Sequence, residues 1–359
     1  MRNIHETILF VDLKKLKKNF NYITSRLDPN CEIIAVVKAF GYGHGDVEIS
    51  KSLESFGVKS FWVADFDEAI ELRKGGIKSK IIIANPGYKS FDEIIKYNLD
   101  VVVYNKKMLS HFIKHRCPIN IHIKFNTGMN RYGFDITEID HIAKKINENS
   151  FLNLISICSH LASSQDVKDS NFTLNQISNF KLITKKMELN ISSKFQKHIL
   201  NSYGLLNFPK HQMDSVRVGI GLYGACNNKN LNEISYLETI ITQQRSVKKG
   251  DRIGYSGKYI ANENMIISII PIGYADGLNR HLGNGAGSVL VKNTLCPIIG
   301  DISMDSCIID TSKVKCKEGD NVRIFSENNP VINLSEKLDT IPYEIYATLN
   351  RRIKRVYLN

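Results

Sequence analysis

A lysine at the end of an apolar run is the residue of this sequence best placed to do chemistry. Lys38 follows the apolar residues 33–37, a pattern typical of a strand buried on both faces in a parallel sheet. Burial lowers the pKa of a lysine, and a neutral lysine amine forms Schiff bases with carbonyl groups. Gly41, Gly43 and Gly45 then break the strand. The alternative is a lysine whose ammonium reaches water from the strand end, and this segment alone leaves both interpretations open.

Strand-like runs and helical patterns alternate around this lysine. The expected strands are residues 33–38, 60–64, 80–84, 100–104, 119–125, 154–160, 198–202 and 215–218. The expected helices are residues 13–26, 46–56, 66–75, 90–97, 136–147 and 171–188. Eight strands within about 190 residues favour an α/β fold, a (β/α)8 TIM-type barrel, over an open doubly wound sheet.

The alternation of strands and helices ends after the barrel. Between residues 237 and 325 strands follow one another with glycine-containing turns and no long helical pattern, which predicts a C-terminal mainly-β domain. We place the barrel domain at residues 1–235 and the β domain at residues 236–359. The strand at 8–11 precedes the barrel and is a candidate to join the second domain. A short helix and an edge strand are expected within residues 343–355.

Composition excludes several classes of function. The chain has 359 residues and a formal net charge of +12, but its lysines are spread without a nucleic-acid motif, so neither a nucleic-acid nor a membrane partner is expected. No apolar run approaches the ~18 residues of a membrane span. The N-terminal stretch carries Glu6 and no small-residue cleavage site, so no signal peptide is expected. Seven cysteines without C-x-x-C spacing favour a reducing cytoplasm and exclude a cysteine metal site.

Polar side chains follow several expected strands of the barrel. Barrel enzymes place their chemistry at the C-terminal ends of the strands. Besides Lys38, the residues found there are the segment 124–131, His160, Asn201, Ser202, Arg217 and the segment 219–221. Each alone is more often structural, but together they indicate one site. The Ser202 hydroxyl and the backbone N–H groups of 219–221 suit a phosphate. A Schiff-base lysine beside a phosphate site indicates pyridoxal 5'-phosphate (PLP).

These segments resemble those of the bacterial alanine racemases, PLP enzymes with a fold-type III barrel. The most specific are A-V-V-K-A-F-G-Y-G-H-G at 35–45, T-G-M-N-R at 127–131 and P-I-G-Y-A-D-G at 271–277. The resemblance continues through S-H-L-A at 159–162, H-I-L-N-S at 198–202 and R-V-G-I-G-L-Y-G at 217–224. It therefore extends over nearly the whole chain.

The resemblance implies a role for each matching residue of the barrel. Lys38 would carry PLP as a Schiff base and Tyr42 would reach its phosphate. Arg131 would contact the phenolic oxygen of the cofactor and the substrate carboxylate. His160 would lie against the pyridine ring, with Arg217 beside the ring nitrogen. The remaining cofactor-binding residues would be Asn201, Ser202, Gly219 and Ile220.

In the β domain the resemblance implies a second base, Tyr255. Tyr274 would line the access to the substrate and Met304 would approach the substrate carboxylate. The implied activity is the interconversion of L-alanine and D-alanine by two bases, Lys38 and Tyr255, which supplies D-alanine for peptidoglycan. The implied assembly is a homodimer in which each site takes Tyr255 from the partner.

The sequence departs from the family pattern at a few positions, which leaves alternatives open. Asn126 replaces an aspartate, which removes a charge near Lys124, a position that is carbamylated in some relatives; the sequence leaves the state of Lys124 open. Val218 replaces a proline, and Arg351 stands where the family has a tyrosine at the substrate access. The alternatives are a racemase of serine or lysine, a decarboxylase of the same barrel class, and a PLP carrier without catalysis. The decarboxylase lacks support because its glycine-run phosphate loop is absent, and the carrier because residues 237–359 follow the barrel.

Overall fold

The structure, a computed structural model, describes residues 4–359 and forms two compact units. Residues 1–3, part of the stretch in which no signal peptide is expected, lie outside the described residues. The barrel unit comprises Phe20–Gly41 and Asp46–Leu222. The β unit comprises the described part of Met1–Asn19, with Tyr42–Gly45 and Tyr223–Asn359. The boundary placed between residues 235 and 236 stays a prediction.

The barrel unit is built on one parallel sheet of eight strands. In spatial order these are β8 (Gln196–His198), β7 (Leu152–Cys158), β6 (Ile119–Lys124), β5 (Asp100–Val103), β4 (Lys80–Ile83), β3 (Ser60–Val63), β2 (Glu32–Val36) and β9 (Ser215–Val218). The two ends of the sheet meet, because the backbone N–H of Arg217 on β9 donates to the carbonyl of Leu200 beyond β8 at 3.0 Å. This ring confirms the predicted barrel.

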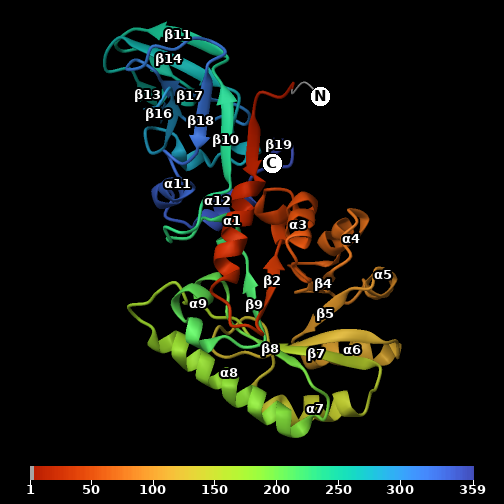
Figure 1. Cartoon of the computed structure of the whole chain (residues 1–359). Coiled ribbons are helices and arrows are strands. Elements are labelled where there is room, and N and C mark those ends of the chain that lie inside the picture. Colours follow the sequence, from red (N-terminus) through yellow and green to blue (C-terminus); the bar gives the residue numbers. More distant parts are fainter. Residues whose placement is uncertain (1–3) are drawn as a thin grey trace. The chain divides into compact units, whose positions relative to one another are not determined.

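Helices lie outside this ring of strands, as Figure 1 shows for α4 to α8. They are α3 (Asp46–Ser55), α4 (Phe66–Lys74), α5 (Phe91–Lys96), α6 (Lys106–His115), α7 (Ile139–Asn147) and α8 (Asn171–Asn190), with the short α9 (Ser202–Asn207) and α10 (Ile220–Tyr223). α1 (Leu13–Thr24) matches the helix expected at 13–26. α6 was not expected from the sequence, although Asn105 accepts a hydrogen bond from the N–H of Met108 and caps it at its start.

The strands are apolar because most are covered on both sides. The side chains of Ile81, Ile83, Val101 and Val103 on β4 and β5 are fully buried. Such continuous burial is typical of parallel sheets covered by helices, and each fully buried Val or Ile contributes roughly 1.5–3 kcal/mol. β6 differs: Asn120, His122 and Lys124 alternate with buried isoleucines, so one of its faces is polar.

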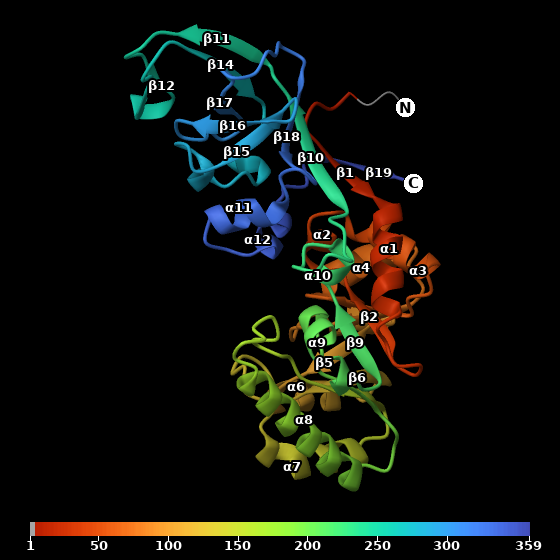
Figure 2. The ribbon, with the colours of Figure 1, turned by 60° about the vertical axis from the view of Figure 1, so that its left-hand side comes forward.

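The β unit contains a mixed sheet of nine strands (Figure 2). In spatial order these are β11 (Gln243–Val247), β14 (Met265–Ile270), β17 (Cys307–Asp310), β16 (Thr294–Ile299), β15 (Ser288–Val291), β18 (Asn321–Phe325), β10 (Ser235–Ile240), β1 (Ile8–Asp12) and β19 (Lys354–Leu358). β12 (Arg252–Ile253) and β13 (Tyr259–Ile260) form a separate hairpin. α11 (Val331–Lys337) packs against α12 (Pro342–Ala347). The expected short helix and edge strand near the C-terminus are α12 and β19.

The first strand of the chain is an inner strand of this sheet. β1 pairs in the antiparallel direction with β10 and in the parallel direction with β19. Leu9 and Val11 are completely buried there. The sheet of the β unit thus joins the two extremes of the sequence.

Two further features bear on the expectations from composition. No helix within residues 4–359 is long and apolar enough to cross a membrane. All seven cysteines are free thiols, five of them buried.

The stability of the β unit depends on pH through Glu233. Burial raises the pKa of this carboxyl to about 7, although the N–H of Val331 donates to it and Lys15 lies near. Between the unfolded pKa of about 4.5 and pH 7 the folded protein therefore binds more protons than the unfolded chain, and stability falls as the pH rises. We expect Glu233→Gln to increase the free energy of unfolding by about 2 kcal/mol at pH 8 and by almost nothing at pH 5.

Urea denaturation at pH 5, 6, 7 and 8 measures this difference. Glu336→Gln, on the exposed side of α11, serves as the control and should give parallel curves. A Glu233→Gln protein whose stability follows the wild type at every pH would contradict the assignment.

Candidate functional site

Lys38 stands at the start of a left-handed turn. β2 ends at Val36, two residues earlier than the strand expected from the sequence. Ala39, Phe40, Gly41 and Tyr42 then have φ values of 54°, 55°, 59° and 51°. This conformation costs about 1–2 kcal/mol for each residue that is not glycine. Strain of this kind persists only where the surroundings hold the backbone.

Glu68 on α4 holds the backbone beside the lysine. One carboxylate oxygen accepts the N–H of Ala39 at 2.6 Å, and the other accepts the N–H of Ala64 at 2.7 Å. Burial raises the pKa of Glu68, while these two hydrogen bonds lower it. Burial lowers the pKa of Lys38, as does the positive charge of Arg131, and Glu68 opposes both. The amine of Lys38 is thereby brought closer to its neutral, nucleophilic form.

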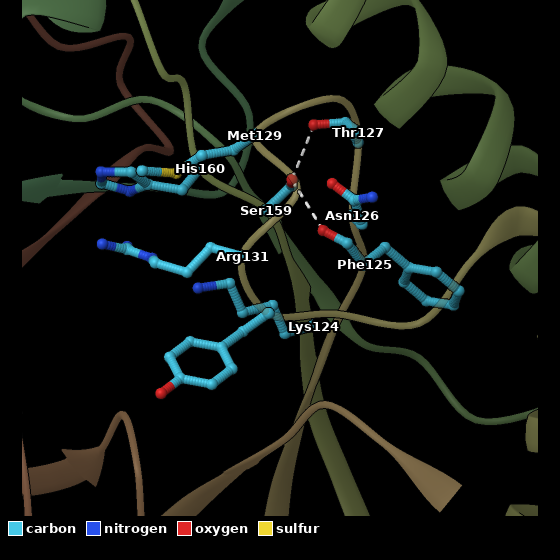
Figure 3. Close-up of a pocket in the computed structure, with 9 residues that line it drawn as sticks. Lys124, Phe125, Asn126, Thr127, Met129, Arg131, Ser159 and His160 are labelled. Carbon is cyan, nitrogen blue, oxygen red and sulfur yellow. Dashed lines mark hydrogen bonds between the residues drawn. The ribbon is translucent and has the colours of Figure 1, made fainter.

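A pocket beside the ends of β6 and β7 is lined by further cations. Figure 3 shows the side chains of Lys124, Arg131 and His160 pointing into the same space. Burial lowers the pKa of Lys124 to about 8, with smaller contributions in the same direction from the charges of Arg217, Arg131 and Lys38 and an opposing one from Cys158. None of the nine described residues that line this pocket carries a carboxylate. The pocket is therefore suited to an anion.

Arg217 and His160 are joined directly. Nη2 of Arg217 donates to Nδ1 of His160 at 3.1 Å. An arginine has no acceptor, so Nδ1 of His160 bears no proton and the neutral ring carries it on Nε2. Burial, followed by the charge of Arg217, holds the pKa of His160 well below its usual value. His160 thus acts through hydrogen bonding and packing rather than as a second positive charge.

Arg217 also begins a chain of hydrogen bonds across neighbouring strands. Nη1 of Arg217 donates to Nδ1 of His198, and Nε2 of His198 lies 3.0 Å from Oγ of Ser156. Oγ of Ser156 lies 2.6 Å from Nδ1 of His122, whose Nε2 faces Asp100 at 3.4 Å. Because Arg217 can only donate, every proton in this chain is directed toward the carboxylate of Asp100. Such aligned chains strengthen each bond and fix the orientation of the guanidinium.

The predicted phosphate-binding residues are brought together. Oγ of Ser202 accepts the N–H of Gly219 at 3.1 Å and that of Gly221 at 3.2 Å. Asn201 lies beyond the end of β8 and caps α9, because its side chain accepts the N–H of Gly204 at 2.8 Å. Ile220, at the start of α10, is buried. The turn after β8 and the turn after β9 therefore meet through Ser202.

The expected phosphate contact of Tyr42 stays a prediction. Tyr42 belongs to the β unit, where its buried ring lies 4.7 Å from the ring of Tyr223. The following residues are fixed within the same unit. His44 contacts the carbonyl of Tyr42 at 2.7 Å and Oγ of Ser235 at 2.8 Å.

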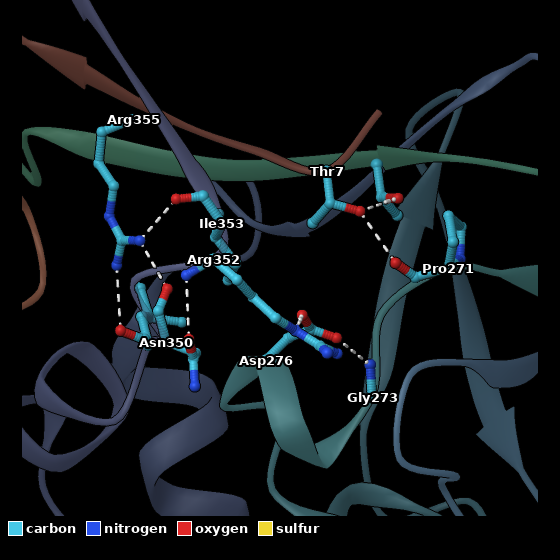
Figure 4. Close-up of polar contacts among 10 residues, drawn as sticks. Thr7, Pro271, Gly273, Asp276, Asn350, Arg352, Ile353 and Arg355 are labelled. Atoms are coloured by element: carbon cyan, nitrogen blue, oxygen red, sulfur yellow. Dashed lines mark hydrogen bonds and ion pairs between the residues drawn. The ribbon is translucent and has the colours of Figure 1, made fainter. Parts of the chain in front are cut away.

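Arg355 holds the same stretch through main-chain carbonyls. Its guanidinium donates to the carbonyls of Gly43 at 2.9 Å and of Leu349 at 3.0 Å. It also donates to the carbonyls of Asn350 and Ile353, as Figure 4 shows. A Cβ on Gly43 would lie 2.0 Å from the carbonyl oxygen of Tyr346, so only glycine fits there. The segment that follows the lysine is therefore built against the last residues of the chain.

Tyr255, Tyr274 and Met304 all lie exposed on the β unit. Their exposed fractions are 67%, 45% and 56%. The N–H of Tyr274 donates to the carbonyl of Ser303 at 3.0 Å, and the N–H of Ala275 donates to that of Met304 at 2.9 Å. These two backbone hydrogen bonds join the turns of Tyr274 and Met304. Tyr255 begins a separate turn at the tip of the β12–β13 hairpin.

The turn of Tyr274 is fixed by Asp276, as Figure 4 shows. One carboxylate oxygen of Asp276 accepts the N–H of Gly273 at 2.8 Å, and the other accepts Nε of Arg352 at 2.6 Å. Arg351 stands at the expected substrate access, and Arg352 follows it. Both are exposed, and Arg352 is bound to this turn.

The sequence interpretation missed Glu68, Asp276 and the histidines behind Arg217. The alternation of Asn120, His122 and Lys124 within an apolar strand was the available signal, because it indicates a polar face inside the barrel. No group of three or more His, Cys, Asp or Glu side chains within residues 4–359 could hold a metal ion.

The chain resembles known proteins along its whole length. The family model for the alanine racemase N-terminal domain matches residues 11–227, and that for the C-terminal domain matches residues 234–357. An alanine racemase of Fusobacterium nucleatum is 35% identical over 95% of this chain and 97% of its own. One of Clostridium tetani is 34% identical over 97% and 94%.

Solved structures agree with these matches. An alanine racemase of Clostridium difficile superposes with a TM-score of 0.93 at 29% identity, covering 99% of this chain and 97% of that one. An alanine racemase from Bartonella henselae, described with covalently bound pyridoxal phosphate, superposes with a TM-score of 0.90 at 27% identity, covering 99% and 100%.

The site geometry predicts a measurable role for Glu68. Removing its charge takes away the group that favours the charged form of Lys38, so we expect Glu68→Gln to lower the pKa of Lys38 further. The rate at which the apoprotein bonds covalently to added PLP, followed by visible absorbance, should then reach half of its maximum at a lower pH. Glu71→Gln, exposed on the same helix, is the control. An unchanged pH midpoint in Glu68→Gln would show that the carboxylate does not act on the amine.

Proposed function

The chain belongs to the alanine racemase family, and from this membership we propose that Lys38 and Tyr255 are the two bases with which it interconverts L-alanine and D-alanine. The reaction class is that of the family, a PLP-dependent isomerisation at a single carbon. The observation that supports the residue assignment most directly is the position of Lys38 at the end of a barrel strand, where desolvation and the positive charge of Arg131 lower the pKa of its amine.

The donor set of the barrel unit fits PLP. Lys38 offers an amine with a lowered pKa to the carbonyl of the cofactor. We assign Arg217 to the pyridine nitrogen. We assign the turns joined at Ser202 to the phosphate, because the Ser202 hydroxyl accepts two backbone N–H groups and still has its own proton to donate. Asn201, Gly219 and Ile220 belong to the same turns, and we assign Tyr42 to the phosphate as well. When bound, PLP supplies an electron sink that acidifies the proton on the substrate Cα.

The residues of the barrel then have separate tasks. Lys38 accepts or returns the proton on one face of the substrate Cα at Nζ, which needs the neutral amine that burial favours. Arg131 holds the substrate carboxylate. Arg217 keeps its own proton, since a guanidinium is a far weaker acid than a pyridinium even where burial lowers its pKa, and so would leave the pyridine nitrogen unprotonated. This limits the withdrawal of electrons and with it side reactions such as transamination.

Tyr255 serves the other face in this proposal. It would accept the proton of L-alanine at its phenolate oxygen, and Tyr274 and Met304 would line the access and contact the substrate carboxylate. We infer a homodimer in which Tyr255 of the partner subunit completes the site around Lys38. The 67% exposure of Tyr255 in the single chain supports this, because it leaves the ring open to be covered by a partner subunit.

The alternatives have less support. A racemase of serine or lysine would keep the same bases, and only the exposed Arg351 points toward it. A PLP carrier without catalysis would not need the β unit, which carries four of the proposed site residues, Tyr42, Tyr255, Tyr274 and Met304. We further propose that the product, D-alanine, is used for peptidoglycan and that the enzyme works in the cytoplasm, where its free thiols are stable.

Turnover of L-alanine by the purified PLP-loaded protein, compared with L-serine and L-lysine, tests the substrate. We expect alanine to be turned over fastest. Lys38→Ala should lose both turnover and the visible absorbance of bound cofactor. Tyr255→Phe should keep the absorbance and lower kcat by about 100- to 10,000-fold, the usual contribution of a general base.

Tyr259→Phe, in the same hairpin, is the matched control and should turn over alanine at the rate of the wild type. Undiminished turnover in Tyr255→Phe would remove Tyr255 from the mechanism. A preference for serine or lysine would keep the bases but transfer specificity to the access around Arg351.

A further inference from the structure

Three separate segments of the β unit carry the residues proposed to act on the substrate side. Tyr255 begins the turn Tyr255–Gly257 between β12 and β13. Tyr274 begins a turn that leads into the short helix Arg280–Leu282. Met304 lies in the loop between β16 and β17. The backbone hydrogen bonds described above join the segments of Tyr274 and Met304 but do not reach the segment of Tyr255. The position of Tyr255 therefore depends on other contacts.

One carboxylate contacts all three segments. Oδ2 of Asp301 lies 3.0 Å from Nζ of Lys258 and accepts Nη2 of Arg280 at 2.7 Å. Oδ1 of Asp301 accepts Nδ2 of Asn284 at 2.8 Å. Lys258 is three residues after Tyr255, and Asp301 itself is three residues before Met304. Asp301 therefore stands at the point where the three segments meet.

The turn that bears Tyr255 has a strained backbone, which persists only if neighbouring groups stabilise it. Gly254, Ser256 and Gly257 have φ values of 74°, 58° and 54°, and the N–H of Gly257 donates to the carbonyl of Gly254 at 3.2 Å. The base of the hairpin is fixed by Ile253, which packs in an apolar cluster with Ile299 just before Asp301. The contact between Lys258 and Asp301 secures the other end of the turn. Tyr255 thus lies between an apolar anchor and a charged one.

The charged anchor is stronger than an ordinary surface ion pair. Isolated exposed pairs contribute little, because their side chains lose entropy and salt screens them. The Asp301 side chain is only 7% exposed and receives three donors, two of them cationic. The hydrogen bonds from Asn284 and Lys258, followed by the charge of Arg280, lower the pKa of Asp301. Carboxylates that accept several charge-assisted bonds impose a defined geometry on their donors.

We propose that Asp301 is a positioning residue for racemisation, which fixes the distance of Tyr255 from Tyr274 and Met304. The proposal rests on the function assigned to Tyr255 above. It concerns the place of the phenol and not the chemistry of the phenol itself. A shift of about 1 Å in such a group can lower a rate about 100-fold.

Asp301→Asn is the test, because the amide keeps an acceptor for Asn284 and loses the charge that holds Lys258 and Arg280. The matched control is Asp320→Asn, since Asp320 likewise accepts Nζ of a lysine, Lys292 at 2.7 Å, but in a turn that carries no proposed site residue. We expect kcat for L-alanine to fall about 10- to 100-fold in Asp301→Asn and to stay at the wild-type value in Asp320→Asn.

Primary isotope effects separate positioning from a general loss of structure. If Tyr255 is displaced, proton removal from L-alanine becomes more rate-limiting, so the effect with Cα-deuterated L-alanine should rise. The effect with Cα-deuterated D-alanine, whose proton Lys38 removes, should stay or fall. Equal changes in both directions, or none in either, would overturn the proposal.

Two further variants make the result decisive. Lys258→Met should reproduce the isotope pattern of Asp301→Asn with a smaller loss of kcat. Lys258→Arg should restore the wild-type isotope effects and kcat. Both results can be obtained even if Asp301→Asn folds poorly. Tyr255→Phe is measured in the same series. Undiminished turnover in Tyr255→Phe would refute the function proposed for this residue. Loss of turnover in Tyr255→Phe together with wild-type turnover in Asp301→Asn would refute only the role of Asp301.

Discussion

The crowding of positive charge at the mouth of the barrel is the constraint on which the rest of the structure depends. Burial and the charge of Arg131 lower the pKa of Lys38, and Lys124 is subject to the same influences. Such a cluster is costly in an empty protein, because desolvated like charges repel. It becomes favourable only when anions arrive, so the binding of phosphate and carboxylate groups relieves a cost already present in the fold.

Arg217 makes this arrangement specific. Its guanidinium is held by His160 on one side and by His198 on the other, and the chain behind His198 ends at the buried Asp100. The charge of Arg217 is thereby balanced at a distance, while none of the nine described residues that line the pocket beside β6 and β7 carries a carboxylate. A lysine in place of Arg217 would keep the charge and lose the two-sided hold on its direction.

The sequence predicted the barrel and the residues at its strand ends, because buried parallel strands and glycine turns leave clear periodic signals. It did not predict the left-handed turn after Lys38, because Ala39 and Phe40 disfavour that conformation in isolation and adopt it only when Glu68 and the neighbouring segments hold it. The contacts of Asp301 were equally hidden, since they join residues that are close only after three turns have folded. The periodicity of the sequence predicts which residues lie at the strand ends. Which of their side chains come into contact depends on the geometry of the folded turns.

The position of β1 has a consequence for how the protein is made. Leu9 and Val11 lie on an inner strand whose neighbour on one side, β19, is the last strand of the chain. At ribosomal rates of roughly 5–20 residues per second, tens of seconds separate the emergence of these two strands. During that interval β1 is an apolar segment without its partner, which is a site for chaperone binding or aggregation. The carbonyl of Gly43 likewise waits for Arg355, so the segment after the lysine is completed only after more than 300 further residues have been synthesised.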